Sequence, residues 1–263
     1  MGSPGLTETA GKEAKEKSGA PVTAQVILIC SVCLAFGCGA TPANKLVVPP
    51  TPTPSPINGS PVLKNTNVSF NTYSREWPVG WEWIDPDPHP PTHHDTDAAV
   101  LHLIVPKGRN MSGDNRTAPR YLKAISGDFE METKVLGRPV FNYQGAGLLM
   151  WRGEKDYVRF ERAYGAGGAG GLRVVARKGD EETEISGTTS IPSDEDETRL
   201  RVVRAGDTFV FLWRAKDDAS WHEAARYAAD YPSSILAGVL AVNTAQEFDV
   251  RFGYIRLEPI GKK

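Results

Sequence analysis

The sequence predicts an all-β fold in which two antiparallel sheets pack face to face. Short segments from about Val68 onward alternate apolar and polar residues with a period of two. No window between residues 68 and 263 has convincing helical periodicity, and Trp221–Asp230 comes nearest to it. About a dozen short strands with almost no helix are typical of a β-sandwich.

Individual segments support this fold class. Phe129–Val135 places its apolar residues on one face and its charged residues on the other. Thr198–Trp213 is expected to form a hairpin, because Gly206 and Asp207 separate two alternating runs. Further strands are expected at AVLHLIVP, GLLMW, YVRFERAY, LRVVARK, ILAGVLAV and FDVRFGYIRLEP.

Composition narrows the possible functions. The chain has 263 residues with a net charge of −2, so no basic excess favours a nucleic-acid partner. Its three cysteines are Cys30, Cys33 and Cys38, and residues 39–263 contain none. The sandwich therefore has no disulfide, no thiolate zinc site and no cysteine nucleophile.

The N-terminal region predicts export and an anchor. Val26–Ala40 is uncharged and has the length of a signal peptide rather than of a membrane span. Small residues precede Cys38, as in a bacterial lipoprotein, although Leu34 stands one place too early. We expect a signal or lipoprotein segment at residues 1–40 with lipidation at Cys38, and a plain signal or an uncleaved anchor is the alternative.

Proline and threonine dominate the next stretch, residues 41–66. Proline at nearly every second position prevents helix and sheet pairing and favours an extended linker. The sandwich is expected to follow at residues 67–260. The chain is thus predicted to be secreted and held on the bacterial cell envelope by a lipid.

Two clusters of titratable residues are candidates for a catalytic site or a metal site. Glu130 and Glu132 share one strand face, but such spacing is also that of a solvated face, so no catalytic residue is assigned. His89–Asp97 is rich in histidine and aspartate, which can bind zinc. Its two prolines and lack of strand spacing predict a polar loop instead, so no metal ligand is assigned. Asp85 and Asp87 could join a calcium site, but one loop supplies too few carboxylates to support it, so no cofactor is assigned.

The stretch Tyr143–Gly165 contains the main candidate surface. We expect GAGLLMW to be a buried strand whose glycines allow a neighbouring strand to approach closely. In the following strand, Val158 and Phe160 are expected to face one way and Tyr157, Arg159 and Glu161 the other. Arg159 could pair with Glu130 or Glu132. This second face is either a plain sheet exterior or a ligand surface.

Aromatic residues suggest sugar binding, since flat rings stack on the C–H patches of sugars. Core packing between the sheets is the alternative for each of them. Together with the charged row, the candidate ligand-binding residues are Trp81, Trp83, Trp151, Tyr157, Arg159 and Glu161.

In order along the chain come GWEWIDPD, LHLIVPKG, APRYLKAISGDFEMETKV, the Tyr143–Gly165 stretch and LRVVRAGDTFVFLW. This series resembles a bacterial domain family of unknown function in the concanavalin A-like lectin/glucanase superfamily. It is similar to the C-terminal sandwich domain of family 43 β-xylosidases. The resemblance implies a jelly-roll sandwich that is usually non-catalytic and implies no established ligand.

The sequence therefore favours a lipid-anchored, non-catalytic domain that binds a polysaccharide or a cell-envelope glycan. Two alternatives stay open. A glycoside hydrolase-related enzyme would bring two carboxylates together in an aromatic groove. A structural or protein-interaction sandwich would bury its aromatic residues and have no glycan ligand.

Overall fold

The computed structural model of the chain describes one compact unit within Gly59–Lys263. Its regular elements are all β-strands, which confirms the predicted fold class. The segments predicted at residues 1–40 and 41–66, including Cys38, lie outside the described residues. Over the described part of the chain, no helix is long and apolar enough to cross a membrane. The described residues are 67–68, 79–97, 100–165, 170–185, 189–191 and 195–261.

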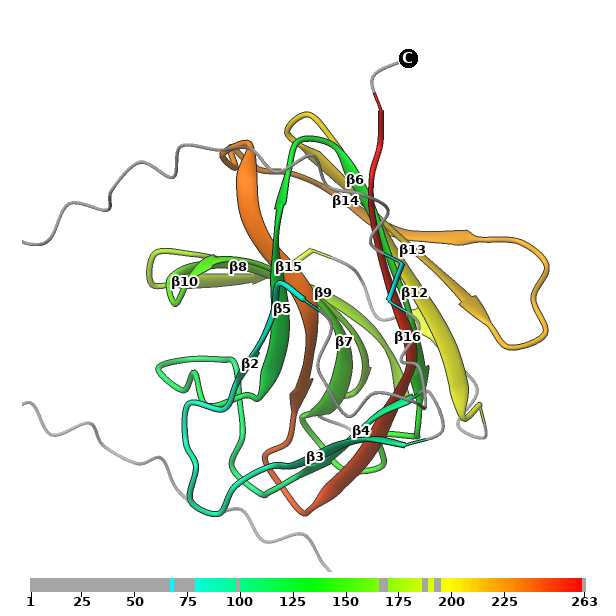
Figure 1. Cartoon of the computed structure of the whole chain (residues 1–263). Helices are drawn as coiled ribbons and strands as arrows, with labels where there is room; N and C mark the ends of the chain where they lie inside the picture. The colour runs from blue at the N-terminus through cyan, green and yellow to red at the C-terminus, as the bar shows by residue number, and fades with distance from the viewer. Residues whose placement is uncertain are drawn as a thin grey trace, which may run out of the picture. The chain divides into compact units, whose positions relative to one another are not determined.

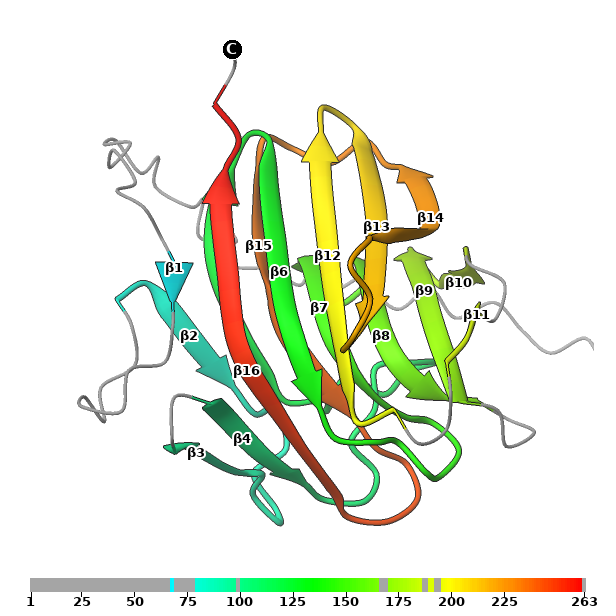
Figure 2. The same ribbon diagram turned by 90° about the vertical axis from the view of Figure 1, so that its right-hand side faces the viewer.

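Sheet 1 is antiparallel and lies in the foreground of Figure 2. Strand β1 (Asn67–Val68) pairs with its strand β16 outside the main order. The main order is β14 (His222–Ala228), β13 (Thr208–Ala215), β12 (Glu197–Ala205), β6 (Phe129–Leu136), β16 (Phe248–Pro259), β4 (Val100–Val105) and β3 (His93–Asp97).

Sheet 2 is also antiparallel; it lies behind sheet 1 in Figure 2 and beside it in Figure 1. Strand β11 (Thr189–Ser190) pairs with its strand β9 outside the main order. The main order is β10 (Glu181–Glu184), β9 (Gly170–Lys178), β8 (Asp156–Tyr164), β7 (Gln144–Gly153), β15 (Ser234–Val242), β5 (Arg120–Ser126) and β2 (Trp81–Ile84).

The apolar core lies between the two sheets. Phe209 and Phe211 of sheet 1 and Leu148 and Phe160 of sheet 2 are fully buried there. The rings of Phe160 and Phe211 meet edge to face, with centroids 5.5 Å apart, and so join the two sheets directly. Alternate residues of each strand therefore point to the outer faces of the sandwich.

Three local expectations have different outcomes. The hairpin around Gly206 is confirmed, because β12 and β13 pair on either side of it. The near-helical segment Trp221–Asp230 is instead the edge strand β14, paired with β13. The expected loop at His89–Asp97 is wrong for its second half. Residues His93–Asp97 form β3, because the two prolines precede the strand and leave its ladder with β4 intact.

Glycine allows close packing within sheet 2, as expected for GAGLLMW. A Cβ atom on Gly147 of β7 would overlap the backbone carbonyl of Phe160 on β8. A Cβ on Gly238 of β15 would overlap the carbonyl of Tyr121 on β5 in the same way. These contacts involve backbone atoms, which cannot move aside as a flexible side chain can.

We predict that Gly147→Ala lowers the free energy of unfolding by about 3 kcal/mol, since the added methyl must push β7 and β8 apart. Urea unfolding measures the change. Gly153→Ala is the matched control on the same strand, because a Cβ there meets no atom within 4 Å. It should change stability by less than about 0.5 kcal/mol. Equal stability of the two variants would contradict the close approach.

Candidate ligand-binding site

The charged row of β8 lies on the outer face of sheet 2. Val158 and Phe160 face the core, while Tyr157, Arg159 and Glu161 point to the opposite face. The alternation predicted for this strand is therefore confirmed. Arg159 is only 3% exposed and Glu161 only 1%, so the row is a buried polar layer rather than a solvated face.

Residues 106–119, which connect β4 to β5, cover part of this face and are called the covering segment below. Its Met111 and Ala118 pack with Leu149, Trp151 and Tyr157 in a second apolar cluster outside the main core. The Tyr157 hydroxyl donates a hydrogen bond of 2.9 Å to the carbonyl oxygen of Met111. This cover takes Tyr157 out of solvent and stabilises the connection against the sheet.

A guanidinium shared by two carboxylates forms the centre of the site. Arg159 donates to both oxygens of Glu161, at 3.1 and 3.2 Å, and to Glu182 of β10 at 3.1 Å. Burial lowers the pKa of Arg159, but Glu161 and Glu182 raise it by more, so the net shift is upward. The guanidinium stays charged and oriented, because each carboxylate fixes one of its ends.

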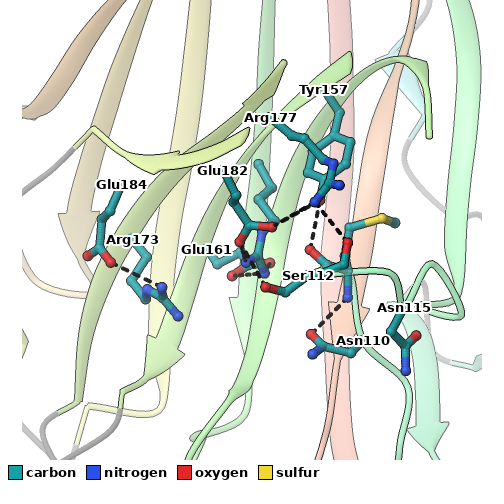
Figure 3. A network of polar contacts seen from close by, with 12 residues as sticks. Asn110, Ser112, Asn115, Tyr157, Glu161, Arg173, Arg177, Glu182 and Glu184 are labelled. Atoms are coloured by element: carbon teal, nitrogen blue, oxygen red, sulfur yellow. Dashed lines mark hydrogen bonds and ion pairs between the residues drawn. The ribbon is translucent and has the colours of Figure 1, made fainter. Parts of the chain in front are cut away.

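Glu182 also ties the covering segment to the sheet, as Figure 3 shows. The Ser112 hydroxyl donates to it at 3.0 Å, and Arg177 of β9 approaches it at 3.7 Å. Arg177 in turn donates to the carbonyl oxygen of Gly113 at 2.8 Å. A neighbouring pair, Arg173 and Glu184 at 3.0 Å, continues the network along β9 and β10.

A cavity of about 360 Å³ opens beside this network. Its volume lies in the range of small-ligand pockets, about 300–1,000 Å³. Most of its surface is apolar, and charged, amide and hydroxyl side chains supply the polar part. The lining residues are Asn110, Ser112, Tyr143, Gln144, Arg159, Glu161, Ala163, Arg173, Val242 and Thr244.

Tyr143 provides an aromatic surface in this cavity. It is 48% exposed and has a backbone φ of 63°, which is rare for a residue with a side chain. Its N–H donates to the carbonyl oxygen of Tyr164 at 2.8 Å, which holds it in this conformation. Strained backbone held by its surroundings is frequent where a protein binds a ligand. Gln144, the next residue, is buried and bonds to Asn243.

The other predicted ligand residues do not line the cavity. Trp81 is 8% exposed in the core between the sheets, where it stacks on Tyr121 at 5.0 Å. Trp83 packs against the same core. Trp151 lies on the outer face but is covered by Arg120, whose guanidinium is 4.5 Å from the ring centroid. Of the six predicted residues, the structure thus brings only Arg159 and Glu161 to the cavity.

The suggested pairing of Arg159 with Glu130 or Glu132 is wrong. Both glutamates lie on β6 of sheet 1, whereas Arg159 lies on β8 of sheet 2. Arg201 of β12 pairs with them instead, at 3.3 Å from Glu130 and 2.6 Å from Glu132. An arginine between these two carboxylates makes them part of an ion-pair row rather than a free catalytic pair.

Sequence reasoning missed Tyr143, Gln144, Arg173 and the polar residues of the covering segment. Nothing in the periodicity of residues 106–119 indicates that this connection folds over the outer face of sheet 2. The available signal for Tyr143 was its position immediately before a predicted buried strand that begins with glycines.

A family model described as "Protein of unknown function (DUF1349)" matches residues 108–260, more than half of the chain. The chain belongs to this family. The match covers most of the covering segment, the β8 row and β10, and so the whole charge network around Arg159. No curated protein sequence matches the chain.

Solved structures show the same fold at low identity. A xylan beta-1,4-xylosidase from Bacillus halodurans C-125 is 15% identical with a TM-score of 0.61, over 77% of this chain and 41% of that one. The GH43B protein of a Bacteroides ovatus xyloglucan locus is 14% identical with a TM-score of 0.62, over 78% and 42%. This chain thus spans less than half of either enzyme.

A third structure is the exoplasmic/lumenal domain of VIP36 in its Ca2+/Man3GlcNAc-bound form. It is 14% identical to this chain with a TM-score of 0.51, over 70% of this chain and 85% of that one. These likenesses confirm the concanavalin A-like sandwich and the resemblance to family 43 xylosidase domains. At such identities they show the fold alone.

We predict an alkaline loss of stability that depends on Tyr157. Burial raises the pKa of its phenol, Glu182 raises it further, and Arg159 and other arginines oppose the shift. The folded state therefore favours the protonated phenol. Its contribution is complete below about pH 10, the ordinary pKa of tyrosine, and is lost as the pH rises further.

Tyr157→Phe should be less stable than the wild type at neutral pH by about 1 kcal/mol, because the bond to Met111 is lost. Urea unfolding should show this gap constant from about pH 6 to pH 8 and narrowing above about pH 10, by up to about 1.4 kcal/mol per pH unit. A gap that is independent of pH would contradict the upward shift.

Proposed function

We propose that the sandwich is a non-catalytic carbohydrate-binding domain whose ligand site is the cavity beside Arg159 and Glu161. One observation carries the proposal: an exposed tyrosine ring shares a cavity with buried, ion-paired side chains and amides. Sugar rings present C–H patches to an aromatic face and hydroxyls to planar polar groups. Both kinds of partner are present within one volume of about 360 Å³.

The rigidity of the polar groups supports binding. Arg159 is fixed by Glu161 and Glu182, and the Gln144 side-chain oxygen already accepts the N–H groups of Val140 and Phe141. A ligand that binds to pre-ordered groups does not have to restrict their rotamers, which would otherwise cost about 0.5–1.5 kcal/mol per side chain. The lectin and glycosidase structures with the same fold agree with a glycan as the ligand class.

The same contacts argue for binding rather than hydrolysis. A glycosidase needs one carboxyl group free to protonate the leaving oxygen and a second one free to attack or to activate water. Glu161 and Glu182 are both hydrogen-bonded to the one guanidinium of Arg159. The oxygens of both carboxylates are therefore held by a fixed cation. This arrangement suits the orientation of a bound ligand rather than hydrolysis.

We predict saturable binding by the chain to one polysaccharide class on an array of xylan, xyloglucan, mannose-rich oligosaccharides and bacterial wall fragments. Tyr143→Ala should weaken that binding at least about tenfold, because it removes the stacking ring. Trp221→Ala is the matched control. Its ring lies between Arg201 and Arg214 of sheet 1, away from the cavity, so binding should be unchanged.

The array is run with calcium and with a chelator, and bound glycans are then assayed for cleavage. Release of reducing ends by the wild type would favour the hydrolase alternative over a binding domain. A blank array from folded protein would contradict the proposal and favour a protein-interaction sandwich. Equal weakening by the Tyr143 and Trp221 variants would place the binding outside the cavity.

We further propose that the domain is displayed on the bacterial cell envelope by a lipid on Cys38. The support is the sequence: Ala35 and Gly37 precede Cys38 in an uncharged apolar stretch, and a proline-rich linker follows. An extended linker of this kind spans about 3 Å per residue and would hold the sandwich away from the membrane.

In a bacterial host, the protein should incorporate labelled palmitate and fractionate with the membrane, and Cys38→Ser should abolish both. Cys33→Ser is the matched control, because it removes a thiol five positions earlier in the same stretch. It should keep the label. Label that survives Cys38→Ser, or an unlabelled secreted protein, would contradict the lipid anchor and favour a plain signal peptide.

A further inference from the structure

We propose that His93, Asp95 and His102 form a binding site for a divalent transition-metal ion, with zinc as the best match to the ligand set. One imidazole nitrogen from each histidine and one carboxylate oxygen of Asp95 all lie within 4.8 Å of one another. The site is on the outer face of sheet 1, near its β3 edge. It is separate from the cavity on sheet 2 and does not depend on the proposed glycan binding.

Strand geometry brings these three side chains together. His93 and Asp95 are two residues apart on β3, so they share a face. Asp95 pairs directly with His102 on β4. On β4, Leu101 and Leu103 are buried in the core, so His102 between them points outward. The formation of β3 therefore supplies the ligand spacing that a loop would lack.

The distances suit a common metal ion. His93 Nε2 lies 2.8 Å from one oxygen of Asp95, and His102 Nδ1 lies 3.8 Å from the other. Two ligands of a tetrahedral zinc ion, each about 2.0–2.1 Å from the metal, are roughly 3.3 Å apart. Small rotations of the exposed His93 and Asp95 side chains bring all three atoms to that separation.

Asp249 of β16 orients His102, the least exposed member of the set. His102 Nε2 lies 3.0 Å from Asp249 Oδ1 and donates its proton to this carboxylate. That bond leaves the lone pair on Nδ1, the nitrogen that faces Asp95. A carboxylate that accepts the distal N–H of a ligating histidine is the usual second partner of zinc sites. Asp249 is thus a positioning residue.

The ligand chemistry selects the class of ion. Two imidazoles and one carboxylate suit zinc, nickel or copper, whereas calcium and magnesium prefer six or more oxygen ligands. Three protein ligands leave a fourth position open on the solvent side. Asp95 and Asp249 contribute two negative charges, and Arg251, 3.8 Å from Asp249, contributes one positive charge. The negative charge that remains around the ligand set favours a dication.

Zinc binding is measured by titration calorimetry on the full chain without a histidine tag, after alkylation of the cysteine thiols. We expect one zinc per chain at micromolar affinity, and calcium at millimolar concentration should not compete. His102→Ala and His93→Ala should each weaken zinc binding more than tenfold. Asp249→Ala should weaken it about 10–100-fold while leaving the melting temperature of the metal-free protein unchanged.

His222→Ala is the matched control, because His222 is exposed on β14 and pairs with Asp218 at 3.3 Å, outside the three-residue ligand set. It should bind zinc as the wild type does. Zinc should also raise the melting temperature of the wild type and of this control but not of His102→Ala. No saturable zinc binding, or equal binding by the wild type and His102→Ala, would overturn the proposal. A loss of zinc binding in His222→Ala as large as that in His102→Ala would also overturn it.

Discussion

The buried guanidinium of Arg159 is the constraint on which the outer face of sheet 2 depends. A charge on a central strand of a sandwich costs several kcal/mol of desolvation unless it is paired. Glu161 supplies one carboxylate from the same strand, but the second, Glu182, comes from β10, two strands away. The position of β10 at the sheet edge is therefore linked to the presence of an arginine on β8.

The same carboxylate also fixes the covering segment. Glu182 accepts the Ser112 hydroxyl and lies 3.5 Å from the Tyr157 hydroxyl, which donates to Met111. The segment thus satisfies polar groups of the sheet while it buries an apolar cluster. The cavity is what remains of the face between this cover and Tyr143. Glycine at position 145 avoids crowding beside the cavity, since a Cβ there would lie 3.3 Å from an oxygen of Glu161.

The fold class could be predicted because alternation and turn chemistry are local. The direction of the Arg159 side chain followed from the same alternation. Its partners did not, because strand order across a sheet is a long-range property that periodicity does not carry. Glu130 and Glu132 were plausible partners by charge alone, yet β6 belongs to the other sheet.

Two edge strands show how local signals fail. The composition of β14 suits a helix, but its residues complete a ladder beside β13, and tertiary pairing overrides propensity. Prolines hid β3, although Pro90 and Pro91 precede it rather than interrupt it. That second error hid the proposed ligand set of His93, Asp95 and His102, because His93 and Asp95 gain a common face only when a strand forms.

The sandwich places its two candidate sites on opposite outer faces. An apolar layer that includes Phe160, Phe211 and Phe252 lies between the sheets and separates the Arg159 cavity from the His102 cluster. Side chains on one outer face can therefore be replaced while the other face keeps its geometry, provided that the core shared by the two sheets stays intact. Substitutions in the proposed cavity on sheet 2 and in the proposed ligand set at the edge of sheet 1 are therefore expected to act independently, because neither set of side chains belongs to the main core between the sheets.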